Sequence, residues 1–551
     1  MTLNEKISEY AQIYDIVGVV NLDHWHELKV YQRTQWLLTT LQALHKKTYT
    51  PDQRILVTLT RNDNQDSLLE NLQSCLYNAD ITNCYVVILC NDIKIALHWN
   101  SGQDVTSINF DFYHSDATIT SGKKRSMYQY NSTDLVNSVD LTDREKFLLN
   151  DSKTFCIYPW VHLHAYPTGE AYPCCHAEMK VGQIGNCQKS ELKEIWNSDK
   201  QKQLRKDMLN ETPNSTCGRC YEQEDNGFFS GRKSANKHHG HNIKRVSNTN
   251  KDGSVDKFEM TYWDIRFSNL CNLKCRSCGH IFSSQWYQDQ AKLAGGDWKE
   301  QNTVLNYAGR TETDMWEQLE PHLDYVEQIY FAGGEPLLME EHYNILEELV
   351  RRKRFDVRLI YNTNFTHTEL KGKSVFEYWK QFDSVAVGAS LDASGPRGEY
   401  IRKGTDWAVV EQNRRNMLQV CPDVDFYISP TLSIMNAWHL PDFHRDWVER
   451  GLIRAQDLNV NILQDPPHYR IDIAPAKYKE QLKTKFLNHI NWLKDKDPLQ
   501  RATVGFESAV NYLTATDNTH LIDTFWRKTH ELDDIRKENI LNIIPELVEL
   551  Q

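Results

Sequence analysis

The sequence has no long apolar run and no segment that would direct it to a membrane. None of its hydrophobic stretches approaches the roughly 18 residues that a membrane-spanning helix requires. The N-terminus, MTLNEKISEYAQIYD, lacks a basic start followed by an apolar stretch, which argues against a secretory signal. We therefore expect a cytoplasmic protein with no membrane partner, in which cysteine thiols stay reduced.

Positive charge is also scarce. The 551 residues include 63 Lys and Arg against 75 Asp and Glu, which gives a formal net charge of −12. Because a nucleic-acid-binding face needs clustered cations to neutralise phosphates, this balance argues against a nucleic-acid partner. The composition, 40% hydrophobic and 25% charged, is that of a chain that buries a real core. The length predicts about two to four domains.

Cysteine is absent after residue 421, and the 13 cysteines are clustered. A reducing compartment disfavours a disulfide framework, so the spacing of the cysteines is the informative feature. Cys271, Cys275 and Cys278 form a C-x3-C-x2-C triplet within FSNLCNLKCRSCGH. A second group of cysteines lies within residues 156–220.

Residues 1–150 predict a small α/β domain. Two short apolar segments, 54–60 and 84–90, are expected to be buried strands, and 66–79 between them has helical spacing. This β-α-β arrangement has no glycine-rich phosphate loop, so no ligand is assigned to it. Its three cysteines, Cys75, Cys84 and Cys90, are expected to be small buried hydrophobic residues.

Parallel βα units are predicted over residues 258–470, where apolar strands alternate with amphipathic helices. The expected strands are 261–268, 326–334, 357–364, 384–392, 425–433 and 458–464. Six such units favour an open barrel over a doubly wound sheet. The preceding segment, 228–257, is polar and basic and is expected to be an exposed linker or mobile loop. Residues 471–551 predict a mainly helical region of unknown role.

The triplet predicts a metal cluster, because three thiolates this close together can reach three corners of an iron–sulfur cube. No fourth cysteine follows nearby, which leaves one iron open for a substrate or cofactor. A zinc site completed by His280 is the competing interpretation.

Further candidate residues follow the next three expected strands. They are Gly333, Gly334, Glu335 and Pro336 after the second strand, Thr363 and Asn364 after the third, and Ser390 and Asp392 after the fourth. In a parallel barrel the carboxyl ends of the strands form one rim, where reactive groups gather. We therefore expect these residues to lie near the triplet.

In these motifs, residues 262–466 resemble the core of the radical S-adenosylmethionine (radical SAM) superfamily. The resemblance implies a partial (β/α)6 barrel and a [4Fe–4S] cluster whose open iron binds the amino and carboxylate groups of S-adenosylmethionine. It also implies that the rim residues named above, together with Arg402 in EYIRKGTDW, bind this cofactor. In one departure, Ser277 precedes the third cysteine, where many members have an aromatic residue near the adenine.

Residues 151–227 resemble the SPASM/twitch domains that accompany radical SAM cores and hold an auxiliary [4Fe–4S] cluster. Here the segment precedes the core, whereas the usual order places it after. The implied ligands are Cys156, Cys174, Cys217 and Cys220, with Cys175 or Cys187 as alternatives to Cys174. A structural zinc is the other interpretation. His162 and His164 are expected to pack beside the site.

The resemblance implies an enzyme that cleaves S-adenosylmethionine reductively and yields a 5′-deoxyadenosyl radical. The implied partners are a peptide or protein substrate and an external one-electron reductant of the flavodoxin or ferredoxin type. The alternative function is a non-catalytic iron–sulfur or zinc protein that acts as a redox sensor or binding module. A carrier or maturation factor, with clusters but no turnover, is a third hypothesis.

Overall fold

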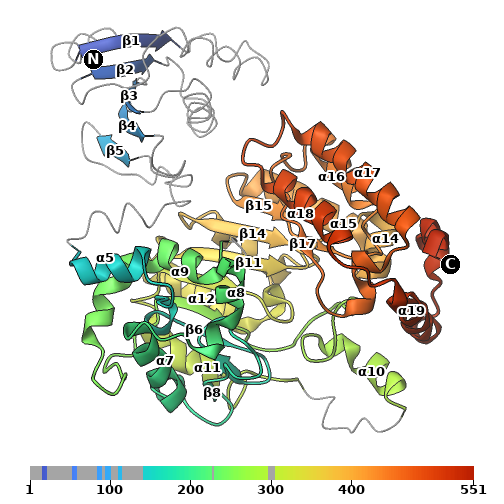
Figure 1. Ribbon diagram of the computed structural model, residues 1–551, viewed down its shortest axis with the longest axis horizontal. Helices are drawn as coiled ribbons and strands as arrows, with labels where there is room; N and C mark the ends of the chain where they lie inside the picture. The colour runs from blue at the N-terminus through green and yellow to red at the C-terminus, as the bar shows by residue number, and fades with distance from the viewer. Residues whose placement is uncertain are drawn as a thin grey trace. The chain divides into compact units, whose positions relative to one another are not determined.

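The computed structural model describes residues 15–21, 53–58, 83–89, 94–100, 109–113, 141–225, 229–295 and 305–550. The chain separates into two compact units (Figure 1). The first comprises residues 1–150 with 236–241, and the second comprises residues 151–235 with 242–551. Within the described residues, no helix combines the length and the apolar character that crossing a bilayer demands.

The first unit contains a five-stranded sheet in the order β1-β2-β3-β4-β5. Its strands are β1 (Asp15–Asn21), β2 (Gln53–Thr58), β3 (Asn83–Leu89), β4 (Lys94–Asn100) and β5 (Asn109–Tyr113). Strands β2 and β3 are parallel, which confirms the two strands predicted in this region. The helix expected at 66–79 lies outside the described residues, as do Cys75 and Cys90. Helix α5 (Asp143–Asn150) also belongs to this unit.

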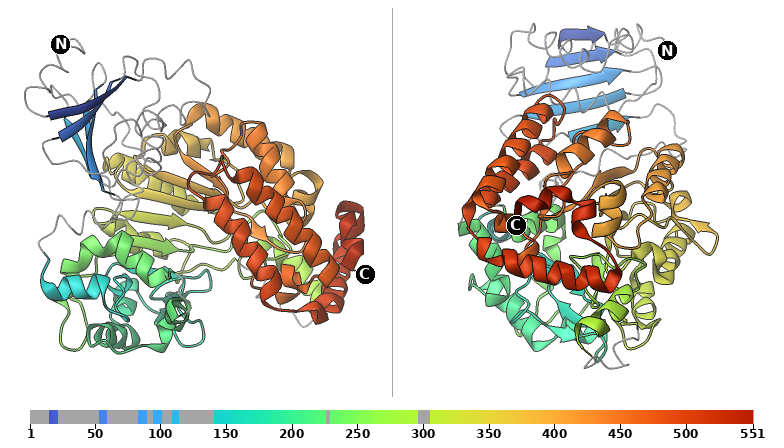
Figure 2. Two further views of the ribbon diagram at one scale, coloured as in Figure 1. Left: turned by 45° about the horizontal axis from the view of Figure 1, so that its top comes forward. Right: turned by 90° about the vertical axis from the view of Figure 1, so that its right-hand side faces the viewer.

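The second unit is built on an eight-stranded sheet in the order β15-β14-β11-β10-β9-β6-β7-β8. Its strands are β6 (His162–Ala165), β7 (Glu170–Tyr172), β8 (Gly185–Asn186), β9 (Tyr262–Ile265), β10 (Gln328–Phe331), β11 (Arg358–Thr363), β14 (Val385–Ala389) and β15 (Asp425–Ile428). All neighbours from β15 to β6 are parallel, and only β7 and β8 are antiparallel to theirs. The parallel strands form one layer beside the C-terminal helices, which are coloured orange to red (Figure 2).

The parallel strands confirm the predicted βα series. The segment expected as the sixth strand contributes β17 (Asn461–Ile462), which pairs in parallel with β16 (Thr431–Leu432), just beyond β15. A parallel bridge between Ile428 and Leu458 continues this pairing. The sequence did not predict that β6, from the cysteine-rich segment, joins the same sheet beside β9.

The two faces of this sheet differ in polarity, because its strands alternate side chains between them. Strands β10, β11 and β15 each alternate half-buried with buried residues. The buried set, which includes Phe331, Leu359 and Phe426, belongs to the apolar core of the unit. The opposite face carries polar side chains such as Tyr330 and Asn362, so it is the face on which a hydrophilic molecule can be bound.

Helices connect and flank these strands. They are α6 (Leu192–Trp196), α7 (Asp199–Leu209), α8 (Gly218–Asp225), α10 (Tyr287–Leu293), α11 (Asp314–Leu319), α12 (Glu340–Arg351), α13 (Val375–Trp379), α14 (Gly395–Ile401), α15 (Trp407–Val420), α16 (Leu440–Glu449), α17 (Ala476–Leu493), α18 (Arg501–Ala515), α19 (Ile522–Arg536) and α20 (Ile540–Ile543). In α12, the buried residues Ile345, Leu346 and Leu349 recur with helical spacing and form an apolar stripe, beside which His342 is also buried. Residues 471–550 are mainly helical, as predicted for 471–551.

Residues 231–248 are helical, although the sequence predicts a linker over 228–257. They form α9 (Gly231–His239) and the 3₁₀ helix η5 (Gly240–Asn248). The polar composition is misleading because several polar side chains of the segment are buried, Arg232 and Asn242 among them. Arg232 contributes to one of the candidate sites below.

Candidate functional site

The cysteine triplet lies in the loop that follows β9, and backbone hydrogen bonds fix the shape of this loop. Lys274 N donates to Lys403 O at 2.9 Å, and Arg276 N donates to Ile401 O at 2.8 Å. Trp286 Nε1, in the 3₁₀ helix η6 (Ser284–Trp286), donates to Cys275 O at 2.9 Å. The loop is therefore held on both sides of Cys275.

Two predicted cofactor residues lie beside the triplet sulfurs. Asn364 Nδ2 lies 4.0 Å from Cys271 Sγ, and Arg402 Nη1 lies 3.7 Å from Cys275 Sγ. Burial raises the pKa of all three thiols, that of Cys278 to about 12, and Cys275 raises the pKa of the other two further. At Cys275, the Arg402 guanidinium opposes this rise in pKa. The thiolates of the triplet would repel one another, and a bound metal would relieve this repulsion because thiolates bind metal as anions.

The glycine pair after β10 packs directly against the cysteine loop. A Cβ on Gly334 would lie 2.1 Å from Leu270 O, and Gly333 adopts a φ of +130° that side chains disfavour. Glu335 N donates to Leu270 O at 2.7 Å, and Gly334 N donates to Ser268 O at 3.2 Å. Both glycines therefore allow a close contact between two loops of the rim.

Glu335 joins the ends of β10 and β11. Its buried carboxylate accepts hydrogen bonds from Thr363 Oγ1 at 2.6 Å, Asn364 N at 2.7 Å and Leu337 N at 3.1 Å. Burial raises the pKa of this carboxyl to about 7, against the lowering effect of these hydrogen bonds. Pro336 starts the 3₁₀ helix η9 (Pro336–Leu338) and is buried. Through these buried hydrogen bonds, Glu335 connects the loop after β10 to the end of β11.

Asp392 and Arg402 form a buried ion pair at the same rim. Arg402 Nη2 donates to Asp392 Oδ1 at 3.0 Å, and Nε lies 2.8 Å from Oδ2. Asp392 Oδ1 also accepts from Thr431 N at 2.8 Å. This pairing fixes the guanidinium beside Cys275, and it neutralises a charge that would be costly to bury alone.

A polar pocket opens on the polar face of the sheet and has a cavity volume of about 390 Å³. It is lined by uncharged hydrogen-bonding side chains: Tyr330, Asn362, Ser390, Tyr427, Ser429, Thr431, Asn459 and Asn461. Ser390 is the predicted cofactor residue among them, and its N donates to Thr363 O at 2.7 Å. The sequence analysis missed the others, although alternation along β10, β11 and β15 would have placed three of them on one face.

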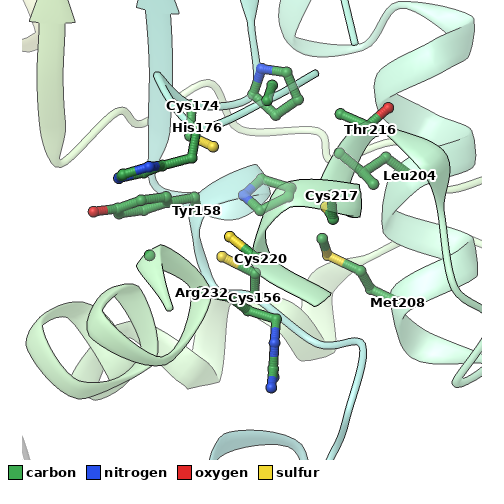
Figure 3. A pocket seen from close by; sticks show the side chains of 14 residues that line it. Cys156, Tyr158, Cys174, His176, Leu204, Met208, Thr216, Cys217, Cys220 and Arg232 are labelled. Atoms are coloured by element: carbon green, nitrogen blue, oxygen red, sulfur yellow. The ribbon is translucent and has the colours of Figure 1, made fainter. Parts of the chain in front are cut away.

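The second cysteine group surrounds another, much smaller pocket, with a cavity of about 20 Å³ (Figure 3). Cys156, Cys174, Cys217 and Cys220, which are the four predicted ligands, all line it. The alternatives to Cys174 lie elsewhere. Cys175 is exposed, and Cys187 is buried in the apolar core. The structure thus brings together the predicted set with Cys174.

The thiols of this pocket are buried close to one another. Burial, together with neighbouring cysteines, raises the pKa of Cys156 and Cys217, the latter to about 12. The backbone N–H groups of Arg232 and Gly231, at the start of α9, lower the pKa of the Cys220 thiol in opposition to burial. Such donors favour a thiolate and would support a metal-bound sulfur.

Arg232 lines this pocket and was not predicted from the sequence. Its Nη1 donates to Ser152 O at 2.9 Å and Phe155 O at 2.8 Å, while Nε donates to Glu224 Oε1 at 2.9 Å. The guanidinium opposes the raised pKa of Cys156, Cys217 and Cys220. A fixed cation therefore lies next to the thiol cluster.

The two histidines of β6 do not line this pocket. His162 Nδ1 lies 3.1 Å from Tyr262 O, and His164 Nδ1 lies 2.9 Å from Asp264 Oδ2. Both side chains are buried. Burial lowers the pKa of His162 to about 4, so it is neutral at pH 7. They tie β6 to β9, in agreement with the packing role predicted for them.

Among the described residues, no three His, Cys, Asp or Glu side chains are arranged to hold a single metal ion. The four thiols of the second group instead border a common space (Figure 3). His280, the proposed fourth zinc ligand at the triplet, has its carbonyl bound by Asn269 Nδ2 at 2.9 Å.

Comparison with known proteins identifies the second cysteine group. Residues 156–221 match the SPASM family, described as an iron-sulfur cluster-binding domain. The match spans all four thiols of the pocket and confirms the predicted SPASM-like domain. The comparison with curated proteins gives no match.

Some solved structures are similar to part of the chain. One is described as "Native anSMEcpe with bound AdoMet"; it is 21% identical, has a TM-score of 0.29, and is matched over 40% of this chain and 58% of its own. A second, "Native anSMEcpe with bound AdoMet and Cp18Cys peptide", is 19% identical, has a TM-score of 0.26, and is matched over 40% and 57%. The chain thus spans less than two thirds of their length.

Proposed function

We propose that this chain is a radical SAM enzyme that modifies a peptide or protein substrate. The observation that carries the proposal is the meeting of three thiols, Asn364 and Arg402 at the carboxyl edge of one parallel sheet. The SPASM domain supports it, because such domains accompany radical SAM cores in the superfamily that the motifs resemble.

Cys271, Cys275 and Cys278 would hold a [4Fe–4S] cluster with one open iron. When bound, the cluster supplies an electron to S-adenosylmethionine and so generates the 5′-deoxyadenosyl radical that abstracts hydrogen from a substrate. Arg402, fixed by Asp392, would balance the charge of the Cys275 thiolate. The hydrogen-bonding groups of the polar pocket would bind the ribose of the cofactor and the adjoining substrate.

We assign the sheet to a partial (β/α)6 barrel with β17 as its sixth strand. The pairing of β16 with β17 and the bridge from Ile428 to Leu458 support this assignment.

The pocket of Cys156, Cys174, Cys217 and Cys220 would hold one auxiliary [4Fe–4S] cluster. With four protein ligands it would have no open iron, so it would relay electrons or hold the domain together. An external protein of the flavodoxin or ferredoxin type would supply the electrons, and the protein would be located in the cytoplasm.

Anaerobic reconstitution tests the proposal. Wild-type protein should bind about eight irons and eight sulfides per chain, from the cysteine count of the two groups. With dithionite, it should convert S-adenosylmethionine to 5′-deoxyadenosine, and Cys271→Ala, Cys275→Ala and Cys278→Ala should each abolish this product. Cys421→Ala, which alters a buried cysteine outside both groups, is the matched control. A protein that binds iron but never consumes S-adenosylmethionine would instead be a sensor or binding module.

A further inference from the structure

The C-terminal helix α19 reaches the loop that carries the cysteine triplet. Arg276, which lies between Cys275 and Cys278, forms a buried ion pair with Asp533 of α19. Its Nη2 also lies 2.8 Å from Glu538 Oε2, just beyond the helix. Its guanidinium carbon lies 3.7 Å from the ring centroid of Tyr400. A residue inside the triplet is thus bound by two carboxylates more than 250 positions away.

Arg536, the last residue of α19, holds the other side of Cys275. Its Nη2 donates to Lys274 O, and its Nε donates to Asp289 Oδ2, each at 2.8 Å. Its guanidinium carbon lies 4.9 Å from the ring centroid of Trp286, whose Nε1 donates to Cys275 O. The side chain of Arg536 is 1% exposed, so these contacts are shielded from water.

The end of α19 is itself fixed. Asp533 accepts hydrogen bonds from Tyr400 Oη at 2.8 Å and from Ile540 N at 2.9 Å, besides its ion pair. Buried ion pairs contribute little net stability compared with apolar residues, but removal of one partner is strongly destabilising because it leaves the other charge buried without compensation. These two pairs both act on the backbone or side chains that flank Cys275. Their placement points to a role in shaping the cysteine loop.

We propose that Asp533 and Arg536 are positioning residues of the triplet site. Asp533 holds Arg276 so that the loop presents its three thiols to one cluster, and Arg536 holds Lys274 while it places a positive charge near Cys275. The inference rests on the proposed function, because it assumes that the triplet binds the cluster. The C-terminal helices are then part of the reactive site.

The test uses reconstituted full-length Asp533→Asn and Arg536→Gln. Asp533→Asn should lower iron from about eight to about four per chain, with the auxiliary cluster kept as proof of a folded second unit. Arg536→Gln should make the midpoint potential of the triplet cluster more negative, because loss of a nearby cation disfavours the reduced cluster. Arg536→Lys keeps the charge and should restore most of the potential. Arg527→Gln, in an exposed ion pair of the same helix, should change neither quantity.

The inference is overturned if Asp533→Asn and Arg536→Gln both match Arg527→Gln in iron content and midpoint potential. It is also overturned if Asp533→Asn loses both clusters in equal measure, because the helix would then support the whole unit rather than the triplet. Wild-type protein whose paramagnetic resonance signal does not respond to S-adenosylmethionine would contradict the proposed function instead. The two failures are therefore distinguishable.

Discussion

Gly334 and Leu270 are in such close contact that no side chain fits between them, since a Cβ at position 334 would lie 2.1 Å from the Leu270 carbonyl oxygen. From the sequence, this glycine was expected to be one of the residues that bind S-adenosylmethionine. The contact with Leu270 gives Gly334 a structural role in addition to any cofactor binding. Leu270 directly precedes Cys271, the first cysteine of the triplet. Gly334 therefore determines where the cysteine loop lies.

Gly334→Ala should therefore remove the triplet cluster rather than weaken cofactor binding alone. The added methyl group must displace Leu270 and with it Cys271, so iron should fall from about eight to about four per chain. Iron analysis and paramagnetic resonance with S-adenosylmethionine measure this. Gly279→Ala is the control in the same loop, because a Cβ there meets no protein atom within 4 Å. Full iron content in Gly334→Ala would contradict the assigned role.

The pocket geometry predicts which cysteines hold the auxiliary cluster. Cys174→Ala should lower iron to about four per chain and leave the S-adenosylmethionine-responsive signal, whereas Cys175→Ala should keep about eight. The reason is that Cys174 lines the pocket and Cys175 is exposed outside it. Cys187→Ala should lower the thermal midpoint through a small core cavity but keep its iron. Loss of iron in Cys175→Ala but not in Cys174→Ala would mean that Cys175 is the ligand.

Gly388→Ala should narrow the polar pocket without affecting either cluster. The new Cβ would lie 2.9 Å from Asn362 Oδ1 and 3.1 Å from the Tyr427 ring, and both of these side chains line the pocket. Affinity for S-adenosylmethionine or product formation should fall at least about tenfold, the equivalent of 1.4 kcal/mol. Equilibrium binding and 5′-deoxyadenosine assays measure this. Unchanged values in a fully iron-loaded variant would show that the pocket is not used.

Arg232→Met should destabilise the second unit and release the auxiliary cluster. The substitution leaves Glu224 without its main ion-pair partner and removes the hydrogen-bond donor to two buried carbonyls. Breaking a buried ion pair in this way lowers the free energy of unfolding by about 3 to 5 kcal/mol. Chemical denaturation and iron analysis measure the two effects. Lys233→Met is the control, because Lys233 faces the same Glu224 carboxylate but is 44% exposed, so it should cost less than about 1 kcal/mol. Equal losses in both variants would contradict the role of Arg232.

A buried histidine pair predicts acid sensitivity of the C-terminal helices. His444 Nδ1 on α16 lies 2.9 Å from His489 Nε2 on α17. Burial lowers the pKa of His444 to about 4 and that of His489 to about 2, and for His489 the neighbouring His444 adds to the effect. A histidine with a lowered folded-state pKa stabilises the fold fully above its unfolded pKa of 6.5, and this stabilisation is lost as pH falls.

The free energy of unfolding should therefore decrease from pH 6.5 towards pH 4.5, by at most about 1.4 kcal/mol per pH unit for each histidine. Chemical denaturation at a series of pH values measures the slope. The double variant His444→Asn with His489→Gln should flatten it, and His520→Gln, at an exposed position, should not. An equal slope in the double variant would place the acid sensitivity elsewhere.

The sequence predicted the parallel strands and the thiols of Cys156, Cys217 and Cys220, and it left Cys175 and Cys187 as alternatives to Cys174. Strand periodicity predicted β9, β10, β11, β14 and β15, and cysteine spacing singled out Cys217 and Cys220. The choice between Cys174 and Cys175 needed the structure, because adjacent residues differ only in the direction of their side chains.

The residues that the sequence analysis missed act over long sequence separations. Arg232 lies in a segment whose composition resembles a linker, yet it reaches carbonyls about 80 positions away. Asp533 and Arg536 contact Arg276 and Lys274 of the cysteine loop across about 260 positions. Pairings of this kind follow from tertiary packing, which neither composition nor periodicity encodes.

The parallel pairing of β6 with β9 couples the two cysteine groups mechanically. The buried contact between His164 and Asp264, at 2.9 Å, lies on this seam, and both side chains are almost fully shielded from water. Without residues 151–227, β9 would become an open sheet edge, which invites aggregation. Asp264 would lose its contact with His164 and keep only Arg266 as its ion-pair partner. Deletion of this domain in evolution or engineering would thus need a replacement edge at the same time, so the domain is not an interchangeable module of the protein.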